Sequence, residues 1–145
     1  MRLAAPSVVL AALLASAAAF TSDEAKPKKP EKPKLDLRAT PRMAFSPVNV
    51  LLTAELTGGD DVEQFYCPEL EWDWDDGGRS VHEADCPPME AGAIMERRFT
   101  AEHAFRRAGT YNVKVTMRRA NKPFAMATAT VTVHPGAGDF GSSNP

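Results

Sequence analysis

The chain lacks the short motifs on which most catalytic sites depend. Its 145 residues contain no Gly-x-Ser-x-Gly elbow, no phosphate-binding loop, no His-Glu-x-x-His pair and no glycine-rich dinucleotide fingerprint. Acidic pairs such as Glu69 and Glu71 can share a strand face, but a single small β-domain offers no obvious deep cleft that would shift their pKa values. We therefore expect no enzymatic activity and no cofactor.

An excess of basic charge and a second long apolar run are also missing. Seventeen Lys and Arg residues stand against nineteen Asp and Glu residues, so electrostatic binding to nucleic acid or to an anionic membrane is not expected. The one apolar run, Leu3 to Ala19, follows Arg2 and ends in small residues. It is shorter than the roughly 20 residues of a comfortable membrane span. The pattern predicts a secretory signal peptide cleaved after Ala19 and a secreted or periplasmic protein, with a retained signal anchor as the alternative.

Cysteine is scarce, with Cys67 and Cys86 alone in the sequence. An even number in an exported chain favours one disulfide, which would close a loop of about 20 residues and stabilise the domain by roughly 3 kcal/mol. Zinc needs three or four convergent ligands, and neither His82 nor His134 has ligand spacing to the other.

No segment of helix length carries a convincing apolar stripe, and the apolar residues recur instead with a period of two. The predicted strands cover residues 35–40, 48–56, 70–74, 97–105, 111–117 and 125–133. Turn residues separate them at intervals of about ten residues, which is typical of an antiparallel β-sandwich. Residues 79–92 read as an irregular segment, with one helical turn around Met89 to Met95 as a further option.

The remaining segments define the domain boundaries. We expect a signal peptide over residues 1–19, a Lys/Pro-rich linker over 20–34, the β-domain over 35–135 and a disordered tail over 136–145. The linker alternates prolines with lysines and has nothing apolar to bury, so it is predicted to be extended and solvated. It could serve as a plain spacer, as a tether or as a weak contact for an anionic polymer.

Residues 70–78 form the most informative segment of the β-domain. A strand places Leu70, Trp72 and Trp74 on one face, and each tryptophan can bury roughly 150–250 Å². Asp76-Gly77-Gly78 then ends the strand with turn residues. We expect this strand to anchor the core, although exposed tryptophans would instead offer a platform for stacking a sugar.

Three motifs, in order, resemble the PKD (polycystic kidney disease) domain family. They are Pro47 to Ala54, which matches an opening strand; Trp72 to Gly77, which matches a Trp-Asp-Phe-Gly-Asp-Gly turn; and His103-Ala104-Phe105 followed by Gly109 to Val113. The resemblance covers residues 35–135 and implies an immunoglobulin-like antiparallel β-sandwich of about seven strands. It also implies a role in recognition or spacing outside the cell, without a defined ligand.

The expected core follows from the same residues. It comprises Trp72, Trp74, His103, Phe105 and Tyr111. His103 lies on an apolar strand face and is expected to be buried, hydrogen-bonded and close to Trp72. Tyr111 is expected to bury its ring and to donate its hydroxyl to the backbone, as in the tyrosine corner of many sandwiches.

Two departures from the family pattern indicate where a ligand could bind. Asp75 stands where the family has its first glycine, which requires a turn change or a positive φ, and the stretch between Gly77 and His103 is longer than the family needs. The candidate surface is therefore the 79–95 insertion with the turn at 75–78. Its candidate residues are Asp75, Asp76, Arg79, His82 and Glu83.

Metal binding is not expected, because the residue spacing of an EF-hand calcium loop is missing. Asp73, Asp75 and Asp76 are only weak candidates for calcium ligands. The sequence thus predicts a non-catalytic interaction or spacer module in the cell envelope or outside the cell. Its partner would be an envelope or extracellular protein or a polysaccharide. The alternative is a carbohydrate-binding module, with or without help from calcium.

Overall fold

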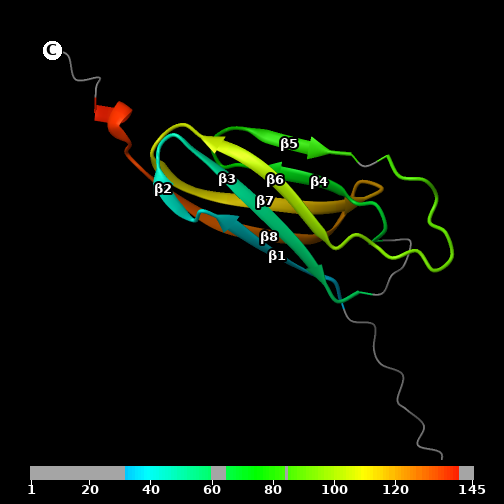
Figure 1. Ribbon diagram of the computed structural model, residues 1–145. Coiled ribbons are helices and arrows are strands. Elements are labelled where there is room, and N and C mark those ends of the chain that lie inside the picture. Colours follow the sequence, from blue (N-terminus) through cyan, green and yellow to red (C-terminus); the bar gives the residue numbers. More distant parts are fainter. Residues whose placement is uncertain (1–31, 60–64, 84, 141–145) are drawn as a thin grey trace, which may run out of the picture.

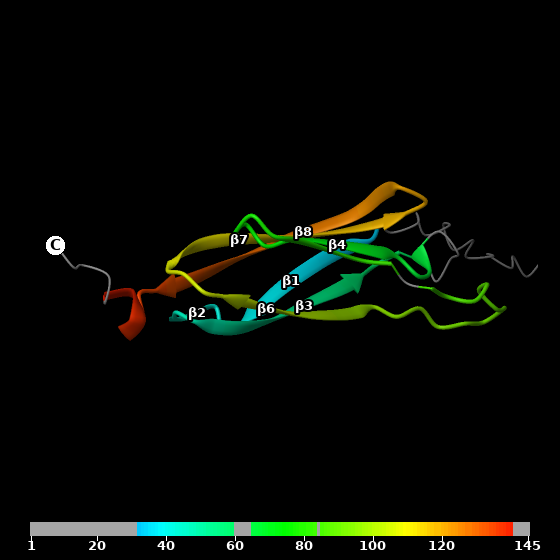
Figure 2. The same cartoon turned by 90° about the horizontal axis from the view of Figure 1, so that it is seen from above.

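The computed structural model describes residues 32–59, 65–83 and 85–140, which form a two-layered β-sandwich (Figure 1). The strands are β1 (Lys34–Thr40), β2 (Met43–Phe45), β3 (Val48–Thr57), β4 (Glu69–Asp73), β5 (Arg79–His82), β6 (Arg98–Phe105), β7 (Gly109–Arg119) and β8 (Lys122–His134). One sheet has the order β1-β3-β6 and the other β2-β8-β7-β4-β5. Figure 2 shows β4, β7 and β8 in one layer, with β3 and β6 in the other.

The period-two pattern of the sequence becomes the alternation between the two faces of each strand. In β3 the buried residues are Val50, Leu52, Ala54 and Leu56, and their neighbours in the sequence are more exposed. Each of the six predicted strand segments is confirmed as a strand, with shifts of one or a few residues at the ends. The predicted connection at 118–123 is a tight hairpin between β7 and β8, in which Ala120 and Asn121 both have positive φ, as the commonest two-residue hairpin loops require.

Two short strands were not predicted. β5 pairs antiparallel with β4, so the prediction of an irregular segment after Gly78 is wrong for residues 79–82. All four residues of β5 are exposed, and they therefore carry no apolar alternation. β2 lies between Pro41 and Pro47 and pairs parallel with β8, so the sandwich contains one parallel pair within an otherwise antiparallel arrangement.

The core lies between the two sheets and contains most of the predicted anchors. Trp72, Trp74 and Phe105 are buried, with relative exposures of 4%, 4% and 1%. His103 and Tyr111 are partly buried, and Tyr111 packs against the edge of this cluster. The tryptophan strand therefore belongs to the core, as its spacing predicts.

The chain beyond the last strand is more ordered than the sequence suggests. Residues Ala137–Phe140 form a short 3₁₀ helix, η2. Gly136 N–H donates to Ser46 Oγ at 3.0 Å and to Asp139 Oδ2 at 2.9 Å, and the Ser46 hydroxyl also donates to Asp139. These contacts lower the pKa of the Asp139 carboxyl. The expected disorder of 136–145 thus does not describe residues 136–140, because a partner 93 residues away holds Asp139; residues 141–145 lie outside the described part.

The predicted signal peptide and most of the predicted linker also lie outside the described residues. The linker boundary at residue 34 is one residue late, since β1 already includes Lys34. No helix in the described ranges is long and apolar enough to cross a membrane.

Candidate functional site

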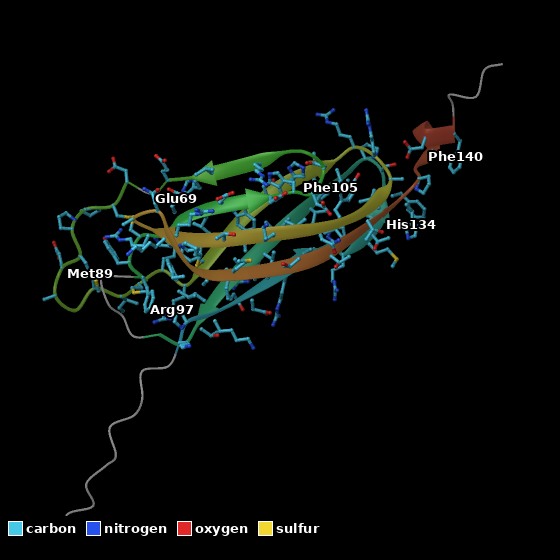
Figure 3. All side chains as sticks on the ribbon, turned by 180° about the vertical axis from the view of Figure 1, so that it is seen from behind. Glu69, Met89, Arg97, Phe105, His134 and Phe140 are labelled. Atoms are coloured by element: carbon cyan, nitrogen blue, oxygen red, sulfur yellow. A yellow bond between two sulfur atoms is a disulfide. The ribbon has the colours of Figure 1, made fainter. Side chains whose placement is uncertain are left out.

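The predicted disulfide is present and ties the long loop to the tryptophan strand. Cys67 and Cys86 are bonded, with their Cα atoms 6.1 Å apart. Cys67 lies just before β4, and Cys86 lies in the loop between β5 and β6. Figure 3 shows Met89 and Arg97 at the same end of the sandwich as Glu69, away from Phe105 and His134. The disulfide therefore anchors the insertion at one end of the sandwich.

A stack of three rings lies in the core between β4 and β6. The rings of Trp72 and Trp74 are parallel, with centroids 5.5 Å apart, and the imidazole of His103 stacks on Trp74 with centroids 4.3 Å apart. The Trp74 indole N–H donates to Ser80 Oγ at 2.7 Å. Because Trp72 and Trp74 are each only 4% exposed, neither ring offers a free face for stacking a sugar.

His103 is hydrogen-bonded as predicted, but its ring stacks on Trp74 rather than on Trp72. Its Nε2 lies 2.7 Å from Asp76 Oδ2, and its side chain keeps 22% of its exposure. Burial raises the pKa of Asp76. Hydrogen bonds from His103 and from the Gly78 N–H, together with the charge of His103, lower it by more, so the pKa of Asp76 lies below its usual value of 3.8. The pair joins the turn after β4 to strand β6.

The turn at Asp75 has the backbone conformation that the missing glycine implies. Asp75 has a φ of 61°, in the left-handed region, and its Oδ2 accepts a hydrogen bond from the Asn112 N–H at 2.8 Å. The Tyr111 hydroxyl donates to the Arg107 carbonyl at 2.8 Å, which is the tyrosine corner expected from the sequence. Both contacts pin the start of β7.

The three weak calcium candidates are held by different protein groups. Asp73 pairs with Arg79 at 3.2 Å, Asp75 accepts from the backbone of β7, and Asp76 pairs with His103. Throughout ranges 32–59, 65–83 and 85–140, no group of three His, Cys, Asp or Glu side chains is arranged to hold a metal ion. Carboxylates that point to separate donors do not supply the six to eight oxygens that calcium takes.

The candidate binding residues from the sequence divide between two places. Asp75 and Asp76 line an open depression of about 700 Å³ that also contains Arg106, Arg107 and Tyr111. Arg79 is engaged on the outer face of β4, where it also approaches Glu71 at 3.6 Å. His82 lines a different depression, and Glu83 is exposed at the start of the loop. The structure therefore does not unite these residues in one site.

A further concavity is a groove between the open edges of the two sheets, and no pattern in the sequence indicated it. It has a volume of about 410 Å³ and continues toward the disulfide in a second part of about 280 Å³. Its apolar floor comprises Tyr66, Leu70, Trp72, Trp74, Phe99 and Ala101. Its rim includes Ser80, Val81, His82, Ile94, Glu96, Arg98 and Glu102. We call this concavity the β5–β6 groove.

The groove exists because both of its walls are sheet edges. β5 ends the five-stranded sheet and β6 ends the three-stranded sheet, so within the described strands neither has a neighbour on its outer side. In sandwiches of the immunoglobulin constant type, a further strand pairs with the equivalent of β6. Here the chain between β5 and β6 passes this edge as a loop and leaves it open.

Comparisons with known proteins support the fold. No family model matches the chain, and no curated protein matches its sequence. Among solved structures, the chain is similar to the CARDB domain of a Pyrococcus furiosus protein, described as a complex with di-metal ions. The TM-score is 0.50 and the identity is 11%, over 72% of this chain and 89% of that one.

Two PKD domains are also among the structures that match. One is from an M14-like peptidase of a Thermoplasmatales archaeon, with 19% identity, a TM-score of 0.49 and coverage of 72% of this chain and 96% of that one. The other is from a human protein, with 21% identity, a TM-score of 0.44 and coverage of 86% and 96%. At such identities a structural likeness concerns the fold and not the ligand. The chain is an immunoglobulin-like β-sandwich with the sequence motifs of a PKD-like domain.

Proposed function

We propose that this chain is an exported, non-catalytic module that binds another protein of the cell envelope or extracellular space through the β5–β6 groove. The observation that carries the proposal is the combination of an apolar, aromatic floor with two open sheet edges. Open edges present backbone donors and acceptors to an incoming chain, and apolar pockets beside them select its side chains.

Export is supported by two features. The N-terminal pattern from Met1 to Ala19 is that of a secretory signal peptide. The Cys67–Cys86 disulfide belongs to the kind of bond that persists in oxidising compartments. Both features suit a periplasmic or secreted domain, in which the Lys/Pro linker separates the sandwich from whatever precedes it.

A protein partner suits the geometry better than a polysaccharide does. Sugar-binding sites use exposed aromatic faces, whereas Trp72 and Trp74 are buried and form a stack with His103. The carboxylates that could have held calcium already have protein partners. A simple spacer would need no groove at all.

Crosslinking and pull-down from the native envelope test this proposal. Val81→Arg places a long charged side chain on the groove rim, and Met126→Arg is the matched control on β8, since the two residues are 57% and 59% exposed. Deletion of residues 79–95 is unsuitable, because it removes strand β5 and Cys86 together. We expect wild type and Met126→Arg to capture the same protein, and Val81→Arg to lose it.

The other outcomes are equally informative. If Val81→Arg and Met126→Arg capture the partner equally well, the binding surface lies outside the groove. Binding on a glycan array without a protein partner would favour the carbohydrate-binding alternative. Absence of any partner or glycan would leave the domain as a spacer.

A further inference from the structure

Strand β6 is the longest open edge in the described sheets. It has eight residues, pairs with β3 along its whole length and has no neighbour on its other side within the described residues. In Figure 1 the chain that leads into β6 extends beyond the end of the sandwich and does not run along this strand. The other end strands offer less free edge, because β2 has three residues, β5 has four, and β1 lies beside β8.

The edge of β6 also lacks the features that keep sheet edges from pairing with other chains. Natural edges are commonly protected by proline, by lysine or by a β-bulge. The sequence of β6, Arg-Phe-Thr-Ala-Glu-His-Ala-Phe, contains neither proline nor lysine. Its pairing with β3 is regular at every position from Phe105 to Arg98. The strand therefore presents an unprotected row of backbone donors and acceptors to an incoming strand.

The side chains of β6 are complementary to a second copy of the same strand. In an antiparallel pair with two-fold symmetry, opposed residues share a face of the sheet, so one residue lies on the axis opposite itself. If this residue is Thr100, Arg98 of each copy lies opposite Glu102 of the other. All three residues are exposed on the outer face. On the groove side, Phe99 then lies opposite the small Ala101.

The neighbouring registers of the same pair are poorer. An axis at Arg98 or at Glu102 would place two like charges directly opposite each other, which is destabilising. An axis at Phe99 would place Arg98 opposite Thr100. An axis at Ala101 would place Glu102 opposite Thr100. Only the register centred on Thr100 forms both pairs of opposite charge, and such cross-strand pairs stabilise an antiparallel sheet.

Both charges are available for these pairs. The Glu102 carboxylate forms no ion pair within the described residues. The Arg98 side chain is 71% exposed and approaches Glu55 at 3.7 Å. A guanidinium carries five N–H donors, so Arg98 can keep this contact and also bind the carboxylate of a second copy.

We propose that two copies of this chain form a two-fold symmetric dimer in which their β6 strands pair antiparallel about Thr100. The two sheets that contain β6 would then continue into one another. Because both copies use the same edge, the dimer closes on itself and leaves no β6 edge for a third copy. This inference goes beyond the proposed function, which concerns a different protein, and the two share only the β6 edge.

Charge reversal tests the dimer, with sedimentation velocity of the exported chain at a series of concentrations as the measurement. The wild type should change from monomer to dimer as its concentration rises. Arg98→Glu opposes carboxylates at both pairs, and Glu102→Arg opposes guanidinium groups, so each single variant should raise the dimer Kd by about tenfold or more. The double variant Arg98→Glu/Glu102→Arg should dimerise again. An equimolar mixture of the two single variants should also dimerise, because each supplies the charge that the other lacks.

A crosslink tests the register and does not depend on the charge variants. Thr100→Cys places a thiol opposite its own copy, with Cβ atoms about 4.5–5.5 Å apart, so a short thiol-specific crosslinker should trap a covalent dimer. Thr53→Cys is the matched control, because Thr53 lies beside Thr100 on β3. Two copies of Thr53 would be three strand spacings apart, or roughly 14 Å. Cys67 and Cys86 are bonded to each other and do not compete for the reagent.

Several results would overturn the proposal. A wild type that stays monomeric at every concentration would exclude the dimer. A dimer that both single charge reversals leave intact, or that their mixture fails to restore, would have its interface elsewhere. Trapping of Thr53→Cys as efficiently as Thr100→Cys would contradict the pairing about Thr100.

The pull-down separates this inference from the proposed function. A chain that dimerises with the expected charge dependence but captures no other protein would keep the dimer and remove the proposed function. Capture of a partner through the groove by a chain that stays monomeric would do the reverse.

Discussion

Removal of the disulfide should weaken the domain by an amount that follows from its loop. The bond joins Cys67 and Cys86, which are 19 positions apart. For a closed loop of about 20 residues, the chain-entropy model gives roughly 3 kcal/mol. For a domain of about 100 residues, each kcal/mol changes the Tm by about 4–8 °C. We therefore expect Cys67→Ser/Cys86→Ser to melt about 12–24 °C below the wild type.

Thermal unfolding followed by circular dichroism, with and without a reductant, measures this effect. The reductant should lower the wild-type Tm to that of the double serine variant and leave the variant unchanged, which separates loss of the bond from any effect of the new hydroxyls. The fold should survive below the Tm, because the pairing of β4 with β7 does not involve the disulfide. A variant Tm within a few degrees of the wild type would refute the reasoning, as would a reductant that destabilises both proteins equally.

Three further predictions concern the tyrosine corner and the turn after β4. Tyr111→Phe removes a hydrogen bond to a backbone carbonyl and should lower the free energy of unfolding, measured in urea, by about 1 kcal/mol. The control is Tyr66→Phe, because the Tyr66 hydroxyl has no hydrogen bond within the described residues. Equal losses of stability in the two variants would contradict the role of the tyrosine corner. Asp75→Ala should be about 1 kcal/mol less stable than Asp75→Gly, because alanine is strained at a φ of 61°; the reverse order would contradict this. Burial raises the pKa of Asp76, but the hydrogen bond and charge of His103 outweigh it, so the folded-state pKa is below 3.8. A depressed carboxyl pKa stabilises the fold at higher pH and loses that effect as pH falls through the folded value. The stability advantage of the wild type over Asp76→Ala should therefore shrink as pH falls below about 3.8, and a carboxyl titration by NMR with a midpoint at or above that value would contradict the prediction.

The sequence predicted the strands whose two faces differ in polarity and missed those whose faces do not. β3 and β7 alternate buried and more exposed residues over most of their length, and a period of two records that difference directly. β5 is exposed at all four positions, so its existence depends on hydrogen bonds to β4 that no local pattern announces. The same holds for β2, which pairs with a strand almost 90 positions later in the chain.

The candidate site was predicted in its parts but not in its arrangement. The sequence identified the disulfide, the long insertion and the unusual Asp75, and each has the structural role that its residue type suggests. It grouped Asp75 and Asp76 with His82, whereas the structure places them in different depressions. The turn at residues 75–78 and strand β5 are neighbours in the sequence, but β5 runs away from the turn, so His82 at its end lies far from Asp75 and Asp76.

The sequence by itself determined the sandwich, the tryptophan anchor and the disulfide, because period-two alternation, aromatic spacing and cysteine number express local or pairwise chemistry. Only the tertiary structure decided which faces of the tryptophans remain free, where Asp139 finds Ser46, and that two sheet edges leave a groove between them. Those features depend on the order of strands in each sheet and on the packing of one sheet against the other. Strand order brings together residues that are far apart in the chain, and no local pattern records which of them will meet.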